Sequence, residues 1–95
     1  MHASVRRYQA VDVAALLTKV QEEFVERVRT VDGFVGYHVI DGGDGTVTSI
    51  TVGESAQAVE ASNVLAKAWV VERAAHLVES APDLTTGEVR VRAER

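Results

Sequence analysis

The fold is decided by residues 33–52, which read GFVGYHVI (33–40), DGGDG (41–45) and TVTSITV (46–52). This pattern predicts a strand, a Gly-rich turn and a second strand that pairs with the first. Side chains alternate across a strand, so Phe34 and Ile40 are expected on one side and Val35, Tyr37 and Val39 on the other. A strand with one solvated face should be apolar on one side only. We therefore expect both faces of this sheet to be buried.

The flanking sequence predicts one helix and one strand on each side of this hairpin. A helix over 13–31 is capped by Asp12 and ends at Gly33, which suits a left-handed position. A second helix over 56–79 is capped by Ser55 and cannot continue through Pro82. Each carries an apolar stripe at three- and four-residue steps. Alternating segments at 2–9 and 86–93 predict the first and last strands.

The resulting order is β-α-β-β-α-β, the ferredoxin-like α+β arrangement, over one domain of residues 1–95. Right-handed crossovers place both helices on the same side of a four-stranded antiparallel sheet. The opposite side stays bare unless another chain covers it. The two-sided apolar strand thus predicts a homodimer formed through the open sheet face.

Composition narrows the class of protein. The 95 residues carry a net charge of −4 and no cysteine, which disfavours nucleic acid and excludes disulfides and thiolate ligands. No apolar run is long enough to span a bilayer and no signal peptide is evident, so we expect a cytoplasmic protein without a membrane partner. Three scattered histidines make a poor metal set, and we expect no metal and no cofactor.

A basic patch is the one feature that favours nucleic acid. Its arginines fall on the first and last strands, which are neighbours in a ferredoxin-like sheet, and RNA-recognition domains share this topology. Glu88 and Glu94 could instead pair with them across the strands. No aromatic platform accompanies the patch, so nucleic acid is not expected. The arginines are Arg6, Arg7, Arg90, Arg92 and Arg95.

The chain resembles the dimeric α+β barrel proteins of the antibiotic-biosynthesis-monooxygenase-like group. The resemblance spans nearly the whole chain and is carried by short motifs: Gly33 to Tyr37, Asp44-Gly45, Ser49 to Val52 with Glu54, and Ala58, Ser62, Ala66 and Trp69-Val70 on the second helix. This resemblance implies a face-to-face dimer with a cavity between helices and sheet in each subunit. It implies a cofactor-independent monooxygenase acting on a polar aromatic or quinol-like molecule, or alternatively a non-catalytic small-molecule-binding or regulatory module.

The resemblance extends less well to the haem-degrading branch of the group. That branch uses an asparagine on the first strand together with a tryptophan and a histidine. The first strand here offers Ser4, Arg6 and Tyr8 but no asparagine, so haem degradation is not favoured.

Trp69, Arg73 and His76 are spaced four and three residues apart, which places Trp69 and His76 on one side of a regular helix. An indole and an imidazole above the sheet could orient and deprotonate a phenol, with Arg73 or Arg6 stabilising its anion. The alternative is that Trp69 fills the core and His76 lies near solvent.

His38 and Tyr37 are competing candidates on the second strand. If His38 faces the cavity, it is the best candidate general base, and Trp69 and Tyr8 would help to orient the substrate. If the parity is reversed, Tyr37 enters the cavity and His38 faces the partner subunit. The sequence leaves both possibilities open.

Overall fold

The computed structural model describes residues 1–95 and has the predicted element order. The strands are β1 (His2–Gln9), β2 (Phe34–Asp41), β3 (Thr46–Gly53) and β4 (Asp83–Glu88). The first helical region comprises α1 (Val13–Lys19), a π turn η1 (Val20–Phe24) and α2 (Val25–Val28). The second comprises α3 (Ala56–Trp69), a π turn η2 (Val70–Ala74) and a 3₁₀ turn η3 (Ala75–Leu77).

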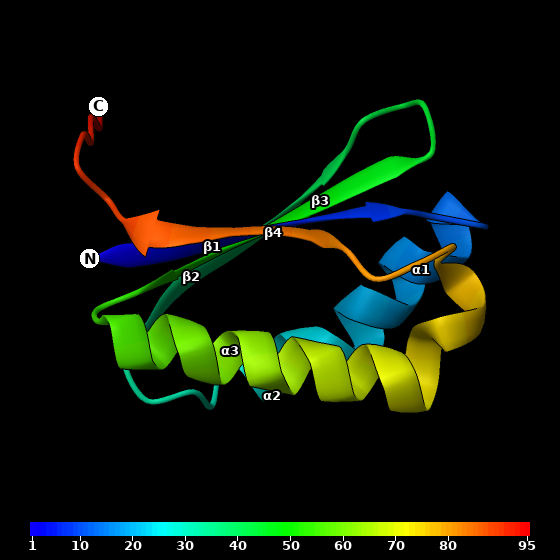
Figure 1. Ribbon diagram of the computed structural model, residues 1–95, viewed down its shortest axis with the longest axis horizontal. Helices are drawn as coiled ribbons and strands as arrows, with labels where there is room; N and C mark the ends of the chain where they lie inside the picture. The colour runs from blue at the N-terminus through cyan, green and yellow to red at the C-terminus, as the bar shows by residue number, and fades with distance from the viewer.

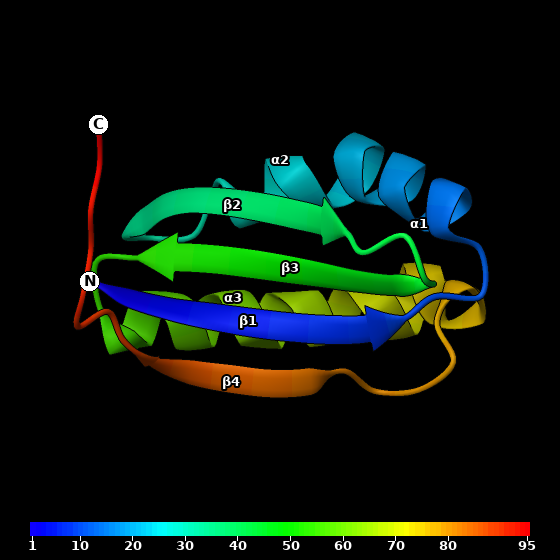
Figure 2. The ribbon, with the colours of Figure 1, turned by 90° about the horizontal axis from the view of Figure 1, so that it is seen from above.

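The sheet has the strand order β2-β3-β1-β4, and every neighbouring pair is antiparallel (Figure 2). Both helical regions lie on the same side of it (Figure 1). The ferredoxin-like fold is therefore confirmed. No helix is long and apolar enough to cross a membrane.

Local signals fix where both helical regions begin, as predicted. Asp12 accepts a hydrogen bond from the backbone N–H of Ala15 at 3.0 Å, and Ser55 caps α3 through Ala58 at 3.1 Å. Gly33 has φ +83°, the left-handed conformation that glycine adopts without strain, but it lies in the turn into β2, because α2 ends at Val28 and not at Gly33 as predicted. These caps connect each helix to the strand before it.

Both helices depart from regular α geometry. The second was predicted as one helix over 56–79, but α3 ends at Trp69 and continues as π and 3₁₀ turns to Leu77. The first contains the π turn η1. A π turn holds more residues than an α turn, so it rotates everything after it about the helix axis. The apolar residues expected on the core side nevertheless stay there beyond each π turn, since Val28 and Leu77 are both buried.

The last strand is also different from the prediction, ending at Glu88 instead of extending over 86–93. Its partner β1 begins at His2, which pairs with Glu88, so later residues have no strand to pair with. The tail leaves the sheet beside the N-terminus (Figure 1). There Arg90 pairs with Glu88 at 3.5 Å and Arg92 with Glu94 at 3.2 Å.

A β-bulge between Phe34 and Gly36 corrects the predicted sidedness of β2. The bulge places Phe34 on the helix side together with Tyr37 and Val39, and not with Ile40. Val35 and Ile40 are exposed on the open side. The strand is thus apolar on both sides, as expected, although the sets differ from the predicted ones.

The two sides of the central strands invert the usual distribution of polarity. On the helix side the buried residues are Ser4, Arg6 and Tyr8 of β1 and Val47, Ser49 and Thr51 of β3. Figure 2 views the sheet from its open side. The residues of the same strands on that side are Ala3, Val5, Arg7, Thr48, Ile50 and Val52. A sheet that served only to build a core would place its apolar residues on the helix side. Polar groups buried beneath helices therefore point to a site.

Candidate functional site

Arg6 is the centre of the buried polar residues, with 3% of its surface exposed. Its Nη1 donates to Oδ1 of Asn63 at 2.7 Å and its Nη2 to Oγ1 of Thr51 at 3.1 Å. These partners come from α3 and β3, so the guanidinium is held between the helix and the sheet. No acidic side chain forms an ion pair with Arg6. Burying a cation without a counter-ion is costly, so this position favours an anion.

Asn63 fixes the guanidinium through a second set of contacts. Its Oδ1 also accepts from Oγ of Ser4 at 2.6 Å, and its Nδ2 donates to Oγ1 of Thr86 at 3.3 Å. The Thr86 hydroxyl donates to Ser4 at 3.2 Å, which closes a ring joining α3, β1 and β4. Because both ends of the Asn63 amide are used within the protein, it acts on any ligand by positioning Arg6.

Two buried tyrosines lie beside Arg6. Burial raises the pKa of Tyr8 and also the pKa of Tyr37, and in both cases the Arg6 charge opposes the rise. Both phenols are therefore protonated at neutral pH and offer hydrogen-bond donors, not bases. The site can stabilise an anion but contains no side chain that would readily accept a proton.

Two hollows meet at Arg6. An outer cleft of about 640 Å³ lies between α3 and the segment that leads into β4. An inner pocket lies among the core side chains. It has an accessible volume of about 20 Å³. Four residues line both hollows: Arg6, Tyr8, Val70 and Val78.

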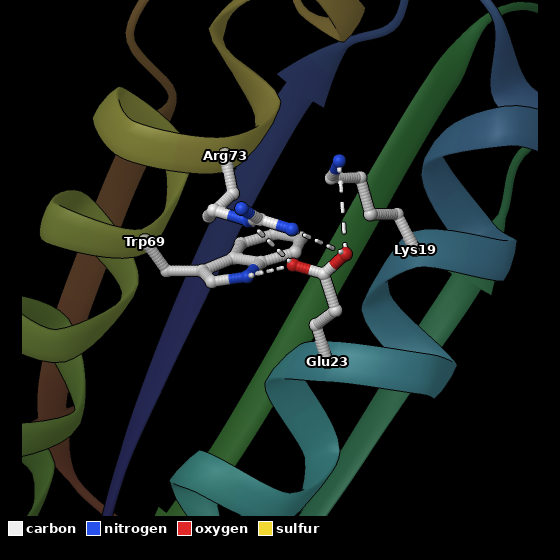
Figure 3. A network of polar contacts seen from close by, with 4 residues as sticks. All are labelled: Lys19, Glu23, Trp69 and Arg73. Atoms are coloured by element: carbon white, nitrogen blue, oxygen red, sulfur yellow. Dashed lines mark hydrogen bonds and ion pairs between the residues drawn. The ribbon is translucent and has the colours of Figure 1, made fainter.

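Trp69 is tied to the opposite helical region by Glu23, as Figure 3 shows. Its Nε1 donates to Oε1 of Glu23 at 3.3 Å, and Nε of Arg73 donates to the same oxygen at 3.0 Å. Lys19 approaches Oε2 at 3.6 Å. Hydrogen bonding from Arg73 holds the pKa of Glu23 below its usual value. Glu23 lies in η1 and Arg73 in η2, so this cluster of Lys19, Glu23, Trp69 and Arg73, here called the hub, joins the two π turns.

The structure brings together four of the residues singled out from the sequence. Those four line the inner pocket: Arg6, Tyr8, Tyr37 and Trp69. Trp69 also packs on Phe24, with ring centroids 5.3 Å apart, and its N–H is engaged by Glu23. Its indole thus contributes a wall to the pocket.

Three other candidates lie elsewhere. His38 is exposed on the open sheet face opposite Ile50, so the second alternative for β2 holds, with Tyr37 on the cavity side. His76 and Arg73 are exposed and line a shallow groove at the end of the helices. Trp69 and His76 do not share a side, because η2 and η3 intervene and break the regular helical spacing.

Sequence reasoning missed Ser49, Thr51, Asn63 and Glu23. Asn63 gave a readable signal, since it is a polar residue within the apolar stripe of the second helix. Ser49 and Thr51 gave none, because alternating polar residues on a strand normally indicate a solvated face. No group of three or more histidine, aspartate or glutamate side chains is arranged to hold a metal ion.

Comparison with known proteins was informative only at the level of structure. No family model and no curated protein matches the sequence. A monooxygenase from the gene ActVA-Orf6 of Streptomyces coelicolor, solved with nanaomycin D, has a TM-score of 0.77 at 20% identity, covering 99% of this chain and 91% of that one. SnoaB, a cofactor-independent oxygenase from Streptomyces nogalater, has a TM-score of 0.76 at 13% identity, covering 99% and 97%.

A third solved structure is MhuD, determined with two manganese protoporphyrin IX molecules in each active site. It has a TM-score of 0.74 at 18% identity and covers all of both chains. At such identities the likeness concerns the fold. The chain has the fold of the antibiotic-biosynthesis-monooxygenase-like proteins.

Proposed function

We propose that this protein is a cofactor-independent monooxygenase that acts on an acidic, polar aromatic such as a quinol or an anthrone-like phenol. The observation that carries the proposal is Arg6, a buried guanidinium that lines both hollows and has no acidic partner. An ionised aromatic supplies the missing negative charge. Two structural neighbours, the ActVA-Orf6 product and SnoaB, are described as a monooxygenase and a cofactor-independent oxygenase.

The roles of the side chains follow from their positions. Arg6 lowers the free energy of the deprotonated substrate and so makes it more acidic. Tyr8 and Tyr37, whose pKa values are raised by burial, donate hydrogen bonds to substrate oxygens. Asn63 and Thr51 orient Arg6. His38, His76 and Arg73 lie outside the two hollows, so their predicted roles in chemistry receive no support from the geometry.

The chemistry needs only the substrate and dioxygen. A ring CH₂ or CH group loses one proton to water, since the site holds no basic side chain, and the resulting carbanion is delocalised onto the phenol oxygens. The carbanion reduces dioxygen and forms a C–O bond, giving a hydroperoxide after protonation. For a CH₂ group, loss of water from the hydroperoxide leaves a ketone, so one oxygen atom enters the product and the other leaves as water. The protein contributes binding, orientation and stabilisation of the anion.

Homodimerisation through the open face is part of the same proposal. Val5, Ile50 and Val52 form an apolar surface there, next to the exposed Val35 and Ile40 of β2. A second copy of this surface would bury all of them. His38 would then lie at the interface between subunits.

Oxygen uptake tests the proposal. The protein is supplied with a panel of quinols and anthrones, and Arg6→Gln is compared with the wild type and with Arg27→Gln, which removes an exposed arginine from α2. We expect uptake by the wild type and by Arg27→Gln, and a fall in kcat/KM of about 10²-fold or more for Arg6→Gln. Binding of panel members without any uptake would instead identify a non-catalytic binding module.

A further inference from the structure

The inner pocket contains a pair of unpartnered polar atoms. Thirteen residues line it, eleven of them hydrophobic, and the other two are Arg6 and Ser49. Only three buried side-chain atoms in the whole chain lack a hydrogen-bond partner, and two of these are Nε of Arg6 and Oγ of Ser49. Each polar residue of the inner pocket therefore carries one unsatisfied donor. Unsatisfied buried donors are rare because each costs free energy, so the coincidence indicates a missing partner.

The sheet holds the two residues side by side. Arg6 on β1 and Ser49 on β3 are direct cross-strand partners and point to the helix side. Side chains of such pairs have their Cβ atoms about 5 Å apart. Both are more than nine-tenths buried, with 3% and 4% of their surfaces exposed. The other guanidinium nitrogens are engaged by Asn63 and Thr51, which leaves Nε for a ligand.

We propose that Nε of Arg6 and Oγ of Ser49 together bind a single anionic oxygen of the ligand, and that this oxygen is a phenolate. The identity of the ligand as an ionised phenol rests on the function proposed above. Tyr37 lines the same pocket. Burial raises the pKa of its phenol, and the Arg6 charge and the approach of the Ser49 hydroxyl oppose that rise, although no Tyr37–Ser49 contact meets the geometry of a hydrogen bond. The Tyr37 hydroxyl supplies a third donor. The aromatic body then extends past Val70 and Val78 into the outer cleft.

Size and charge select this ligand among the alternatives. A volume of about 20 Å³ holds one small group, because a single water needs about 10–15 Å³ by the same measure. A carboxylate has two charged oxygens and would leave one against the hydrophobic walls. A water would satisfy the two donors but would leave the Arg6 charge uncompensated. A phenolate oxygen satisfies the donors and neutralises the charge.

Binding of 4-nitrophenol tests this assignment, because its ionised form has its own absorbance band and no turnover is needed. We expect the wild type to bind the phenolate at least tenfold more tightly than 4-nitroanisole, which lacks the ionisable oxygen, or 4-nitrobenzoate. Ser49→Ala should weaken phenolate binding about 10–150-fold, the loss of one hydrogen bond to a charged group, and leave 4-nitroanisole unaffected.

Two further variants complete the comparison. Ser62→Ala removes another fully buried hydroxyl, one that donates to the Val59 carbonyl outside both hollows, and should leave both affinities unchanged. Arg6→Lys keeps the charge but lacks Nε, so it should weaken phenolate binding as well. Ser49→Ala should also unfold at a slightly higher temperature than the wild type, because it removes an unsatisfied group, whereas Ser62→Ala should unfold at a lower one.

The outcomes separate this inference from the proposed function. Oxygen uptake together with equal phenolate binding by Ser49→Ala would overturn the inference and leave the monooxygenase intact. Ser49-dependent phenolate binding without uptake would support the inference in a binding module. Equal binding of 4-nitrobenzoate and 4-nitrophenolate would overturn the phenolate assignment. A water retained between Arg6 and Ser49 in a crystal structure with 4-nitrophenol would do the same.

Discussion

The two faces of the sheet are made by alternate residues of the same strands, yet their polarity is opposite to that of an ordinary α+β domain. Beneath the helices lie Ser4, Arg6, Ser49 and Thr51, while the face without helices carries residues such as Ile50. A sheet with one solvated side normally places polar residues in water and apolar ones in the core. This inversion is the basis of the two proposals, a ligand on the helix side and a second copy of the chain on the open side.

Each face is therefore incomplete in a different way. The helix side lacks a negative charge for Arg6 and a partner for Ser49. The open side lacks cover for its apolar residues. An anionic ligand would complete the first, and a second copy of the chain would complete the second. One substitution on each face, which exchanges a polar and an apolar side chain, tests these two expectations separately.

The largest effect is expected from Ile50→Asp on the open face. Two aspartates would be buried in a symmetric dimer, at about 3–5 kcal/mol for each unpaired charge, so the dimer should weaken by 10²-fold or more. Light scattering at micromolar concentration should give the 10.2 kDa mass of one chain for the variant and twice that mass for the wild type.

Val91→Asp is the matched control, because Val91 lies in the tail with 91% of its surface exposed. It should leave the mass unchanged. A wild type that runs as a monomer, or an Ile50→Asp variant that remains a dimer, would show that the apolar open face is not the interface.

Local sequence signals predicted much of the fold, because its elements are specified by neighbouring residues. Asp12 and Ser55 act within one helical turn and fixed where the helices begin. The β-bulge near Val35 and the end of β4 at Glu88 depend on pairing between strands, which no local window contains.

The site was predictable only in part for a related reason. Arg6, Tyr8 and Tyr37 attracted notice because their residue types are chemically conspicuous. Ser49 did not, since a serine that alternates with apolar strand residues normally faces water. The rule fails here because the polar side faces the helices, and only the tertiary structure shows which side that is.

An intermediate effect is expected from Arg6→Met on the helix side. Replacing a buried cation that has no counter-ion by an apolar side chain of similar length should raise the free energy of unfolding by about 1–2 kcal/mol, despite the loss of two hydrogen bonds. The same variant should lose the ligand. Urea denaturation and 4-nitrophenol binding would measure the two quantities.

Arg27→Met is the control for that experiment and should change neither stability nor binding. If Arg6→Met instead lowered the free energy of unfolding by more than about 1 kcal/mol, the hydrogen bonds of Arg6 would outweigh the cost of burying its charge, and Arg6 would be a structural residue. The buried polar residues on the helix side would then be explained without a ligand, and only the open face would remain incomplete.

The smallest effect concerns Glu23, which holds the helical layer together above the site. Its pKa is lowered, chiefly by the hydrogen bond from Arg73, so its ionised form stabilises the folded state. This contribution is present above the ordinary carboxyl value of 4.5 and is lost as the pH falls through the lowered folded-state value. The urea midpoint of Glu23→Gln should therefore lie below that of the wild type at pH 7, and the difference should shrink on acidification below about pH 4.5.

Glu26→Gln provides the comparison, because Glu26 is exposed on α2 and contacts only Arg29, at 3.4 Å. Its midpoint should differ less from the wild type at pH 7, since an exposed pair contributes little. The pKa of Asp44 is also lowered, chiefly by the backbone N–H of Thr46. Asp44 is present in all three proteins, so its contribution cancels when their urea midpoints are subtracted. A Glu23→Gln difference that persisted unchanged at low pH would mean that the hub acts through packing of Trp69 and Arg73 and not through its charge.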